Sequence, residues 1–372
     1  MREHNQYIDI IKGLSIISIV IGHSCWNLPY NGFPIGSFVY TYHIMTFIFV
    51  AGMCVNKVVS ESKDTIIGRQ ISKQWILYML YSCIAILFHN CFLELGIIPQ
   101  EARYGIREII TRISNAAFYM TTEYLLPALW FVPFYIVALL VFKLILLYTN
   151  IYKKVGLYVI CIFCGITGII LCYKQVYLIY HLQTALLSMP IILIGYKAGD
   201  IILNKDICGG MINYVIIGVG LAFGLWKIVE KFGSIDLAVN VIASPILFYP
   251  ITFAGIAFCL ILAKIINRIS VLSRIIEVLG KYSFHIMALH IICFKLVDYL
   301  YCVLVLKDTD ALSAFPHSFY NWIVYLYWIT GTGLPVLSGI TFQALKKLWK
   351  NRHLTSDNIQ NDNGFFFSNR DI

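Results

Sequence analysis

Charge is scarce in this sequence. Only 13% of the 372 residues are Asp, Glu, Lys or Arg, and 59% are hydrophobic, whereas a soluble domain carries about 25% charged residues. This shortage excludes an ordinary soluble domain. Ser-rich or Pro-rich linkers and fixed-period repeats are also lacking, so we expect one domain over residues 1–350. The cysteines and histidines show no zinc-binding spacing, and no metal is expected.

Long apolar segments are what the sequence has instead, and they predict an all-α polytopic transmembrane helical bundle of about ten spans. The expected spans are 8–27, 36–56, 75–96, 129–149, 155–173, 178–201, 211–229, 238–264, 280–304 and 320–345. The remaining segment, 351–372, is rich in Asn, Asp and Ser and predicts a disordered cytoplasmic tail.

The basic residues are unevenly distributed between the connections. With the N-terminus in the cytoplasm, 20 of the 28 Lys and Arg residues fall on the inner side and 8 on the outer side. Cytoplasmic connections of membrane proteins are enriched in Lys and Arg. The pattern therefore predicts that both termini are cytoplasmic. It also accounts for the net charge of +9 without any nucleic-acid partner.

The first apolar segment carries ionisable residues, which are rare inside a span and usually face a partner, a cavity or a substrate. Lys12 and His23 are eleven residues apart, so about three helical turns place them on one face, about 16 Å apart. His43 lies on the second span, which runs in the opposite direction, so both histidines fall in the outer third. We expect His23 and His43 to face one cavity. The alternative for each is a hydrogen-bonded core histidine. The same reasoning places His89, His181 and His290 in the outer half.

Basic residues also flank the inner ends of the first spans. Lys57, Arg69 and Lys73 lie between the second and third spans, and Lys12 projects along the first. Such a basic rim has two interpretations, contact with anionic lipid headgroups or with the phosphates of a nucleotide-like cofactor.

The longest connection, 97–128, is expected on the outer side. Within it Ile106, Ile109, Ile110 and Ile113 recur at helical spacing, which predicts an amphipathic helix on the outer surface. Such a helix is either a simple connector or a lid over a substrate cleft.

Four stretches of the sequence together resemble a known family. They are YIDIIKG with IGHS at 7–24, YHIMTFIFVAG at 42–52, LWFV at 129–132, and GKYS followed by LH at 280–290. They resemble the acyltransferase-3 family of bacterial integral-membrane O-acyltransferases, in the branch that acts on polysaccharides and glycolipids. That family has a motif of one basic residue, ten further residues and then a histidine. Lys12 and His23 have this spacing.

The resemblance implies an O-acetyltransferase of the bacterial inner membrane. Its donor would be acetyl-CoA from the cytoplasm, and its acceptor a hydroxyl of a cell-surface polysaccharide or lipid-linked glycan. His23 would act as general base, with His43 orienting it or donating to the oxyanion. The cofactor would be held by four basic residues, Lys12, Lys57, Arg69 and Lys73, and the acceptor contacted by Trp130 and His290.

Three alternatives remain open on the sequence. The chain would otherwise be an exporter or transporter of a polysaccharide or lipid intermediate, or a sensory or structural membrane protein. Within the enzymatic interpretation, an acyl-enzyme on His23 or Ser24 is an alternative to direct transfer.

Overall fold

The computed structural model describes residues 6–25, 34–58, 63–99, 103–152, 154–204, 209–242, 244–307, 309–313 and 322–365. Their regular elements are helices, apart from one short antiparallel ribbon in which Ile235 pairs with Ile242, and loops and turns connect them. The α-helices are α1 (Gln6–Ser24), α2 (Ile35–Tyr40), α3 (His43–Val58), α4 (Lys63–Leu87), α5 (His89–Glu94), α6 (Ile106–Tyr119), α7 (Phe131–Tyr152), α8 (Lys154–Tyr173), α9 (Leu182–Leu187), α10 (Met189–Asn204), α11 (Met211–Phe232), α12 (Phe248–Asn267), α13 (Ser270–Lys281), α14 (Ser283–Tyr301) and α15 (Ile323–Phe365). The shorter elements are the 3₁₀ turns η1 (Pro127–Trp130), η2 (Ile179–His181), η3 (Leu237–Val239) and η5 (Asp310–Ser313), the π-helical turn η4 (Cys302–Leu306), and strands β1 (Ile235–Asp236) and β2 (Val241–Ile242).

The predicted helical bundle is confirmed, but with fewer spans than the ten expected. Eight helices of the described chain are long and apolar enough to cross a membrane, and the pair α9–α10, bent by 55°, makes up to nine. The eight are Gln6–Ser24, Ile35–Val55, Pro127–Thr149, Val155–Tyr173, Met211–Phe232, Phe248–Asn267, Ser283–Leu306 and Ile323–Leu348. The protein is therefore a multi-pass membrane protein.

The expected third span, 75–96, is the one that falls short. The apolar part of this region is Ile71–Leu87, and the helix breaks before α5. Close to this break, the Asn90 side chain accepts from the backbone N–H of Tyr104 at 2.8 Å and donates to its carbonyl at 2.9 Å.

The expected span 238–264 begins later than predicted. Its first residues belong to the β1–β2 ribbon, and α12 starts only at Phe248. Asn240 adopts a left-handed φ of 56° and is buried, and its side chain accepts from Gln183 Nε2 at 3.1 Å. A buried Asn and Gln that satisfy each other can lie among apolar residues, which hides such a turn from a hydropathy pattern.

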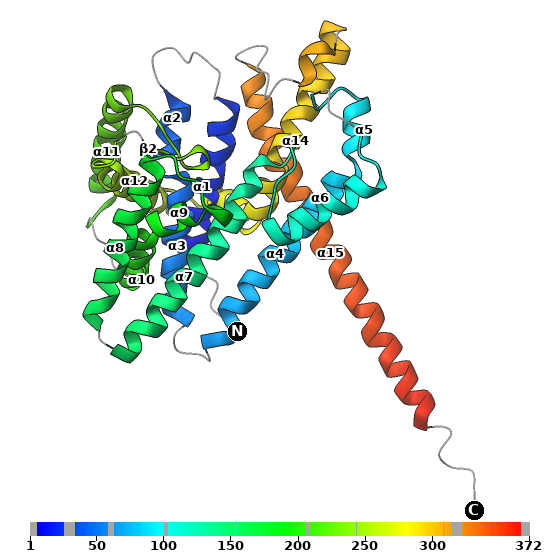
Figure 1. The fold of residues 1–372 in the computed structure, drawn as a ribbon, viewed down its shortest axis with the longest axis horizontal. Coiled ribbons are helices and arrows are strands. Elements are labelled where there is room, and N and C mark those ends of the chain that lie inside the picture. The colour runs from blue at the N-terminus through cyan, green and yellow to red at the C-terminus, as the bar shows by residue number, and fades with distance from the viewer. Residues whose placement is uncertain are drawn as a thin grey trace, which may run out of the picture.

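The backbone of α15 continues as a helix to Phe365, through much of the segment whose composition predicts a disordered tail. Residues 366–372 lie outside the described residues. The division into one domain of 1–350 and a tail stays a prediction. In Figure 1, α15 leaves the bundle and extends away from it.

Helix α1 forms the centre of the bundle. It packs against α2, α3, α12, α13, α14 and α15. Its serines cost little to bury, because Ser15 and Ser18 donate to the carbonyls of Ile11 and Leu14, each at 2.9 Å. By contrast, α8 and α11 on the outside keep most of their apolar side chains exposed, as a lipid-facing helix does.

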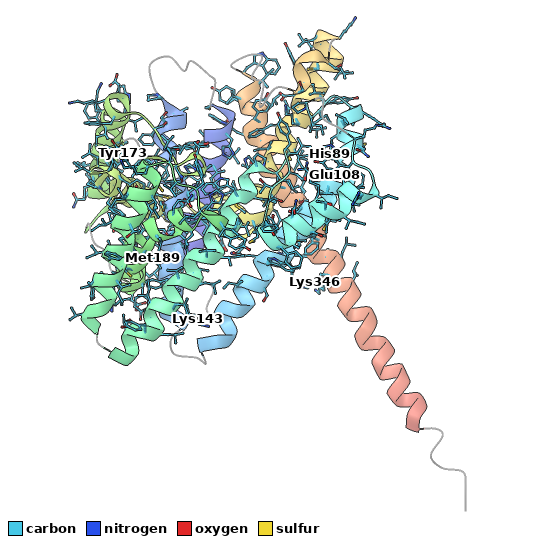
Figure 2. The ribbon with its side chains drawn as sticks, viewed as in Figure 1. His89, Glu108, Lys143, Tyr173, Met189 and Lys346 are labelled. Atoms are coloured by element: carbon cyan, nitrogen blue, oxygen red, sulfur yellow. The ribbon has the colours of Figure 1, made fainter. Side chains whose placement is uncertain are left out.

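The two ends of the bundle differ in the residues they carry. Figure 2 shows Lys143 and Lys346, both predicted on the inner side, toward one end. His89 and Tyr173, both predicted on the outer side, lie toward the other. The relative placement agrees with the charge pattern, while the direction in which the bundle faces stays a prediction.

Candidate active site

Four aromatic side chains gather at the end of α1, each from a different helix. The rings of His23 (α1) and His290 (α14) stack, with centroids 5.0 Å apart and an interplanar angle of 17°. Tyr40 (α2) lies 6.1 Å from His23 and 4.6 Å from His43 (α3), between ring centroids. The structure thus brings His23 and His43 to one place, with Tyr40 between them.

A relay of hydrogen bonds determines where the protons of these imidazoles lie. His290 Nδ1 is 2.9 Å from the carbonyl of Ile286, and because a carbonyl only accepts, Nδ1 carries the hydrogen. In the neutral ring His290 Nε2 is then an acceptor. His23 Nδ1 lies 2.7 Å from it and donates. His23 Nε2 is therefore left with its lone pair, which is the state a general base needs.

His43 is fixed in the same tautomer. Its Nδ1 donates to the carbonyl of Val39 at 2.7 Å, so Nε2 of the neutral ring carries a lone pair. In this state His43 accepts a hydrogen bond at Nε2 and does not donate one. The expected donation to an oxyanion thus requires the protonated ring.

Burial distinguishes the three histidines. His43 is 1% exposed and His290 is fully buried, whereas His23 is partly exposed. His23 is thus the member of the trio that a reactant reaches. His290 contacts His23, and its expected role on the acceptor stays a prediction.

Ser24 follows His23 directly, but its hydroxyl is engaged. It donates to the carbonyl of Ile21 at 2.9 Å and accepts from the Trp328 indole N–H at 2.8 Å. The side chain is buried at 1% exposure. A hydroxyl in this setting is poorly placed to become an acyl-enzyme.

The basic residues do not form one cluster in the described part of the chain. Lys12 pairs with Asp9 at 2.5 Å, three residues earlier on α1. Lys73 is exposed on α4 and acts electrostatically on His285 of α14. The side chains of Lys57 and Arg69 lie outside the described residues.

Trp130 occupies a different place from the histidine cluster. It lines a cavity of about 370 Å³, where its ring lies 4.9 Å from that of His181. The cavity is bounded by Tyr119, Met120, Thr121, Thr122, Trp130, Pro133, Tyr177, Leu178, Tyr180 and His181. Of the five histidines expected in the outer half, three thus form the cluster, and His181 contributes to this cavity.

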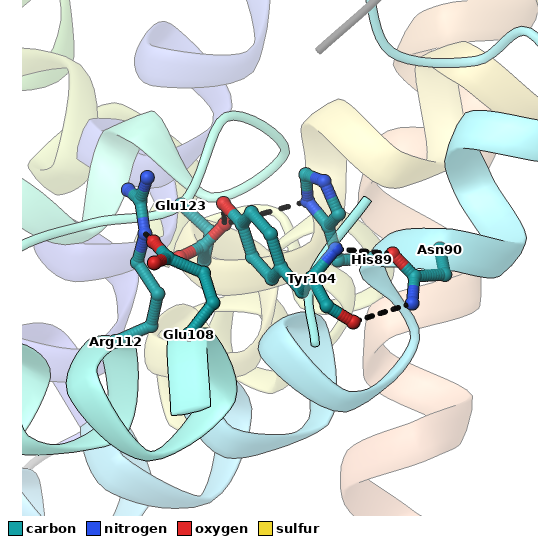
Figure 3. A network of polar contacts seen from close by, with 6 residues as sticks. All are labelled: His89, Asn90, Tyr104, Glu108, Arg112 and Glu123. Carbon is teal, nitrogen blue, oxygen red and sulfur yellow. Dashed lines mark hydrogen bonds and ion pairs between the residues drawn. The ribbon is translucent and has the colours of Figure 1, made fainter. Parts of the chain in front are cut away.

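The fifth histidine, His89, belongs to a polar network that includes residues of the connection 97–128 (Figure 3). The ring of His89 stacks on that of Tyr104 at 3.4 Å, and its Nδ1 lies 3.9 Å from Glu123 Oε2. Arg112 lies 5.0 Å from the Tyr104 ring and donates to Glu108, a bond that raises the pKa of Arg112. The network ties the predicted amphipathic helix, confirmed as α6, to the loop before η1.

One acidic residue near the cluster was missed by sequence reasoning, because it lies outside the spans. β1 packs against α2, and the Asp236 carboxylate acts electrostatically on Tyr40. Burial raises the pKa of Asp236, against backbone hydrogen bonds from Ala238 and Val239 that lower it. The sequence could have indicated Tyr40, because it precedes His43 by three residues, and in the helix expected over 36–56 the two side chains would lie on neighbouring faces.

Together these features define a polytopic helical membrane protein with a histidine relay at one end of its central helix. Among the described residues, no three His, Cys, Asp or Glu side chains gather as a metal site does. The family profile described as an acyltransferase domain, acyltransferase 3, matches residues 5–340. The chain therefore belongs to the acyltransferase 3 family and is a membrane O-acyltransferase. Neither the curated proteins nor the solved structures yield a match.

Proposed function

We propose that this acyltransferase moves an acetyl group from cytoplasmic acetyl-CoA to a hydroxyl of a cell-surface polysaccharide or lipid-linked glycan, in the bacterial inner membrane. The relay from Ile286 through His290 to His23 carries the proposal. It leaves the Nε2 atom of a partly exposed histidine unprotonated at the end of the central helix. A glycan hydroxyl is a poor nucleophile until such a base removes its proton.

The transfer is direct in this proposal. His23 Nε2 takes the proton of the acceptor hydroxyl as its oxygen attacks the thioester carbonyl, and a tetrahedral oxyanion forms. The carbon–sulfur bond then breaks, and the leaving thiolate takes the proton back from His23. While His23 is protonated, its Nδ1–H bond to His290 becomes charge-assisted, which stabilises that state.

The donor enters at the opposite end of the bundle. Lys73 is exposed there, and Lys57 and Arg69 lie on the helices that flank the same connection. We propose that these three residues bind the phosphates of acetyl-CoA. Lys12 is held by Asp9 and contributes its charge as part of an ion pair.

Substitution of His23 tests the proposal. Surface glycan purified from cells that lack the gene serves as acceptor, and incorporation of labelled acetyl from acetyl-CoA is measured with the purified protein in nanodiscs. We expect His23→Ala to lower kcat by about 10²–10⁴ with an unchanged elution profile. Ser24→Ala should keep most of the activity, because Ser24 forms no acyl-enzyme. Full acetylation by His23→Ala would exclude His23 as the base.

A further inference from the structure

The cavity at Trp130 lies outside the histidine cluster, and the proposed chemistry leaves it without a role. Its walls come from two separate parts of the chain, the loop after α6 and the segment before α9, with η1 between them. Tyr180 joins the walls by donating to the carbonyl of Phe118 at 2.5 Å. At about 370 Å³ the cavity falls within the range of about 300–1,000 Å³ for small-molecule sites.

The backbone at this cavity is unusual. Met120, Tyr180 and His181 all adopt left-handed φ angles, of 51°, 56° and 55°. Residues other than glycine adopt the left-handed region only at a cost in conformational energy, and they persist there where the surrounding structure holds them. Three of the six non-glycine residues with positive φ in the described chain line this one cavity.

A network of hydrogen bonds, buried at Gln183 and Asn240, holds the strained wall in place. Gln183 accepts from the backbone N–H of Leu178 at 3.0 Å and donates to Asn240 at 3.1 Å. Asn240 in turn donates to the carbonyl of Val176 at 3.2 Å. Tyr177 donates to Gln175 and lies 3.1 Å from the carbonyl of Val239. The β1–β2 ribbon is thus a support for this wall.

The lining combines aromatic faces with polar groups. Trp130 and the tyrosines offer flat apolar surfaces, and Thr121 and Thr122 contribute hydroxyls. His181 Nδ1 is buried without a hydrogen-bond partner among the described residues, so no protein contact fixes its tautomer. Flat apolar faces beside donors and acceptors suit the two sides of a sugar ring, whose C–H face is apolar and whose rim carries hydroxyls.

The cavity is separate from the base but close to its support. η1 packs against α14, which carries His290. Phe131, next to Trp130 in the chain, contacts Phe47, with ring centroids 5.8 Å apart, and Phe47 lies one turn along α3 from His43. An aromatic contact thus links the segment that carries Trp130 to the helix that carries His43.

We propose that this cavity binds one sugar ring of an oligomeric acceptor glycan while another ring of the same chain presents its hydroxyl to His23. The inference rests on the proposed function and adds to it that the acceptor spans at least two sugar units. Trp130 stacks on the bound ring, and His181 bonds one of its hydroxyls.

The test compares acceptor length. Surface polysaccharide from cells lacking the gene, and single sugars released from it by hydrolysis, are the two acceptors. Trp130→Ala should lower kcat/KM for the polysaccharide about tenfold or more. His181→Ala should lower this kcat/KM several-fold, and His181→Gln should lower it less than His181→Ala does. None should change kcat/KM for single sugars or KM for acetyl-CoA. Trp226→Ala, on α11 away from the cavity, is the matched control.

Each other outcome contradicts the inference. Equal kinetics for Trp130→Ala and Trp226→Ala would exclude a binding role. A parallel loss with single sugars and polysaccharide would mean that Trp130 only supports the fold. Wild-type protein that transfers no acetyl to either acceptor would overturn the proposed function and this inference together.

A binding measurement separates the glycan from lipid as the occupant. In the His23→Ala background, the polysaccharide should change tryptophan fluorescence, and the additional Trp130→Phe substitution should abolish that change. Quenching of Trp130 by brominated phosphatidylcholine, with no response to polysaccharide, would show that lipid occupies the cavity.

Discussion

At the scale of single residues, the site depends on two backbone carbonyls. The carbonyls of Ile286 and Val39 each accept from Nδ1 of the histidine four residues later, His290 and His43. Both belong to helical turns, where the carbonyl of residue i lies near residue i+4. The tautomers of these histidines are therefore determined by helix geometry.

Substitution of His290 tests this arrangement, because in the proposed mechanism His290 positions the base through its contact with His23 Nδ1. His290→Leu removes the group that accepts from His23 Nδ1, and kcat should fall about 100-fold with KM for acetyl-CoA unchanged. His290→Gln offers an amide oxygen to the same N–H and should stay within about tenfold of wild type. Steady-state kinetics on the purified variants are the measurement. Equal losses for Leu and Gln would contradict the relay.

Asp236 gives a second prediction, in the dependence of stability on pH. Its pKa is raised in the folded protein, so the folded state binds its proton more tightly than the unfolded state does. Stability should therefore fall as pH rises from the ordinary carboxyl pKa through the raised one. Asp236→Asn keeps the side-chain oxygen that accepts from Ala238 but cannot ionise.

The measurement is thermal unfolding in detergent between pH 4 and pH 8. The difference in Tm between Asp236→Asn and wild type should grow in favour of the variant as pH rises across this range. A difference that stays constant with pH would show that Asp236 does not titrate there. Asp200→Asn, for an acidic residue on α10, is the control for general effects of lost charge.

At the scale of elements, α1 is held in place by unusually close packing against α13. A Cβ added to Gly280 would overlap the carbonyl oxygen of Asp9, and one added to Gly13 would overlap the carbonyl of Ile276. Small residues let helix backbones approach in this way. The amphipathic α13, not expected from the sequence, thereby determines the position of the Asp9–Lys12 pair.

Gly280→Ala should therefore destabilise the protein, by about 1–3 kcal/mol, since an added methyl in a tight interface forces the backbone apart. Gly220→Ala on α11 is the matched control, because nothing lies within 4 Å of its added Cβ and alanine favours a helix. Thermal unfolding of both variants in detergent is the measurement. Equal melting temperatures would show that α1 and α13 separate without cost.

Elements were predicted well where apolar segments were long and poorly where polar residues pair across the fold. Most expected spans coincide with helices, because length and hydropathy determine a span. The break at Phe88 and the β1–β2 ribbon were not predicted. Beside each of them an amide side chain, Asn90 or Asn240, bonds a partner far along the chain, and a hydropathy pattern does not register such a bond. The candidate site was also predicted only in part. The sequence predicted that His23 and His43 lie together. It did not predict the hydrogen bond between His290 and His23, because that bond joins helices far apart in sequence.

At the scale of the whole molecule, the number of crossings determines where the chain ends. With nine spans the two termini lie on opposite sides, and with ten they lie on the same side. The tenth crossing depends on α4, whose apolar part Ile71–Leu87 covers about 25 Å, somewhat less than the hydrocarbon core of about 30 Å. A mismatch of this size is accommodated by local thinning of the bilayer.

We expect α4 to cross, because the charge pattern predicts both termini on the inner side. Lys73 then lies at the inner end of α4, and His89 lies on the outer side. Alkaline phosphatase fused after Gly105 should be active, which requires an outer location. Green fluorescent protein fused after residue 372 should be fluorescent, which requires an inner one. An inactive phosphatase fusion with a dark C-terminal fusion would mean nine crossings, with α4 remaining on the inner side. In that case His89 and the connection 97–128 would lie on the inner side, and the predicted outer location of α6 would be wrong.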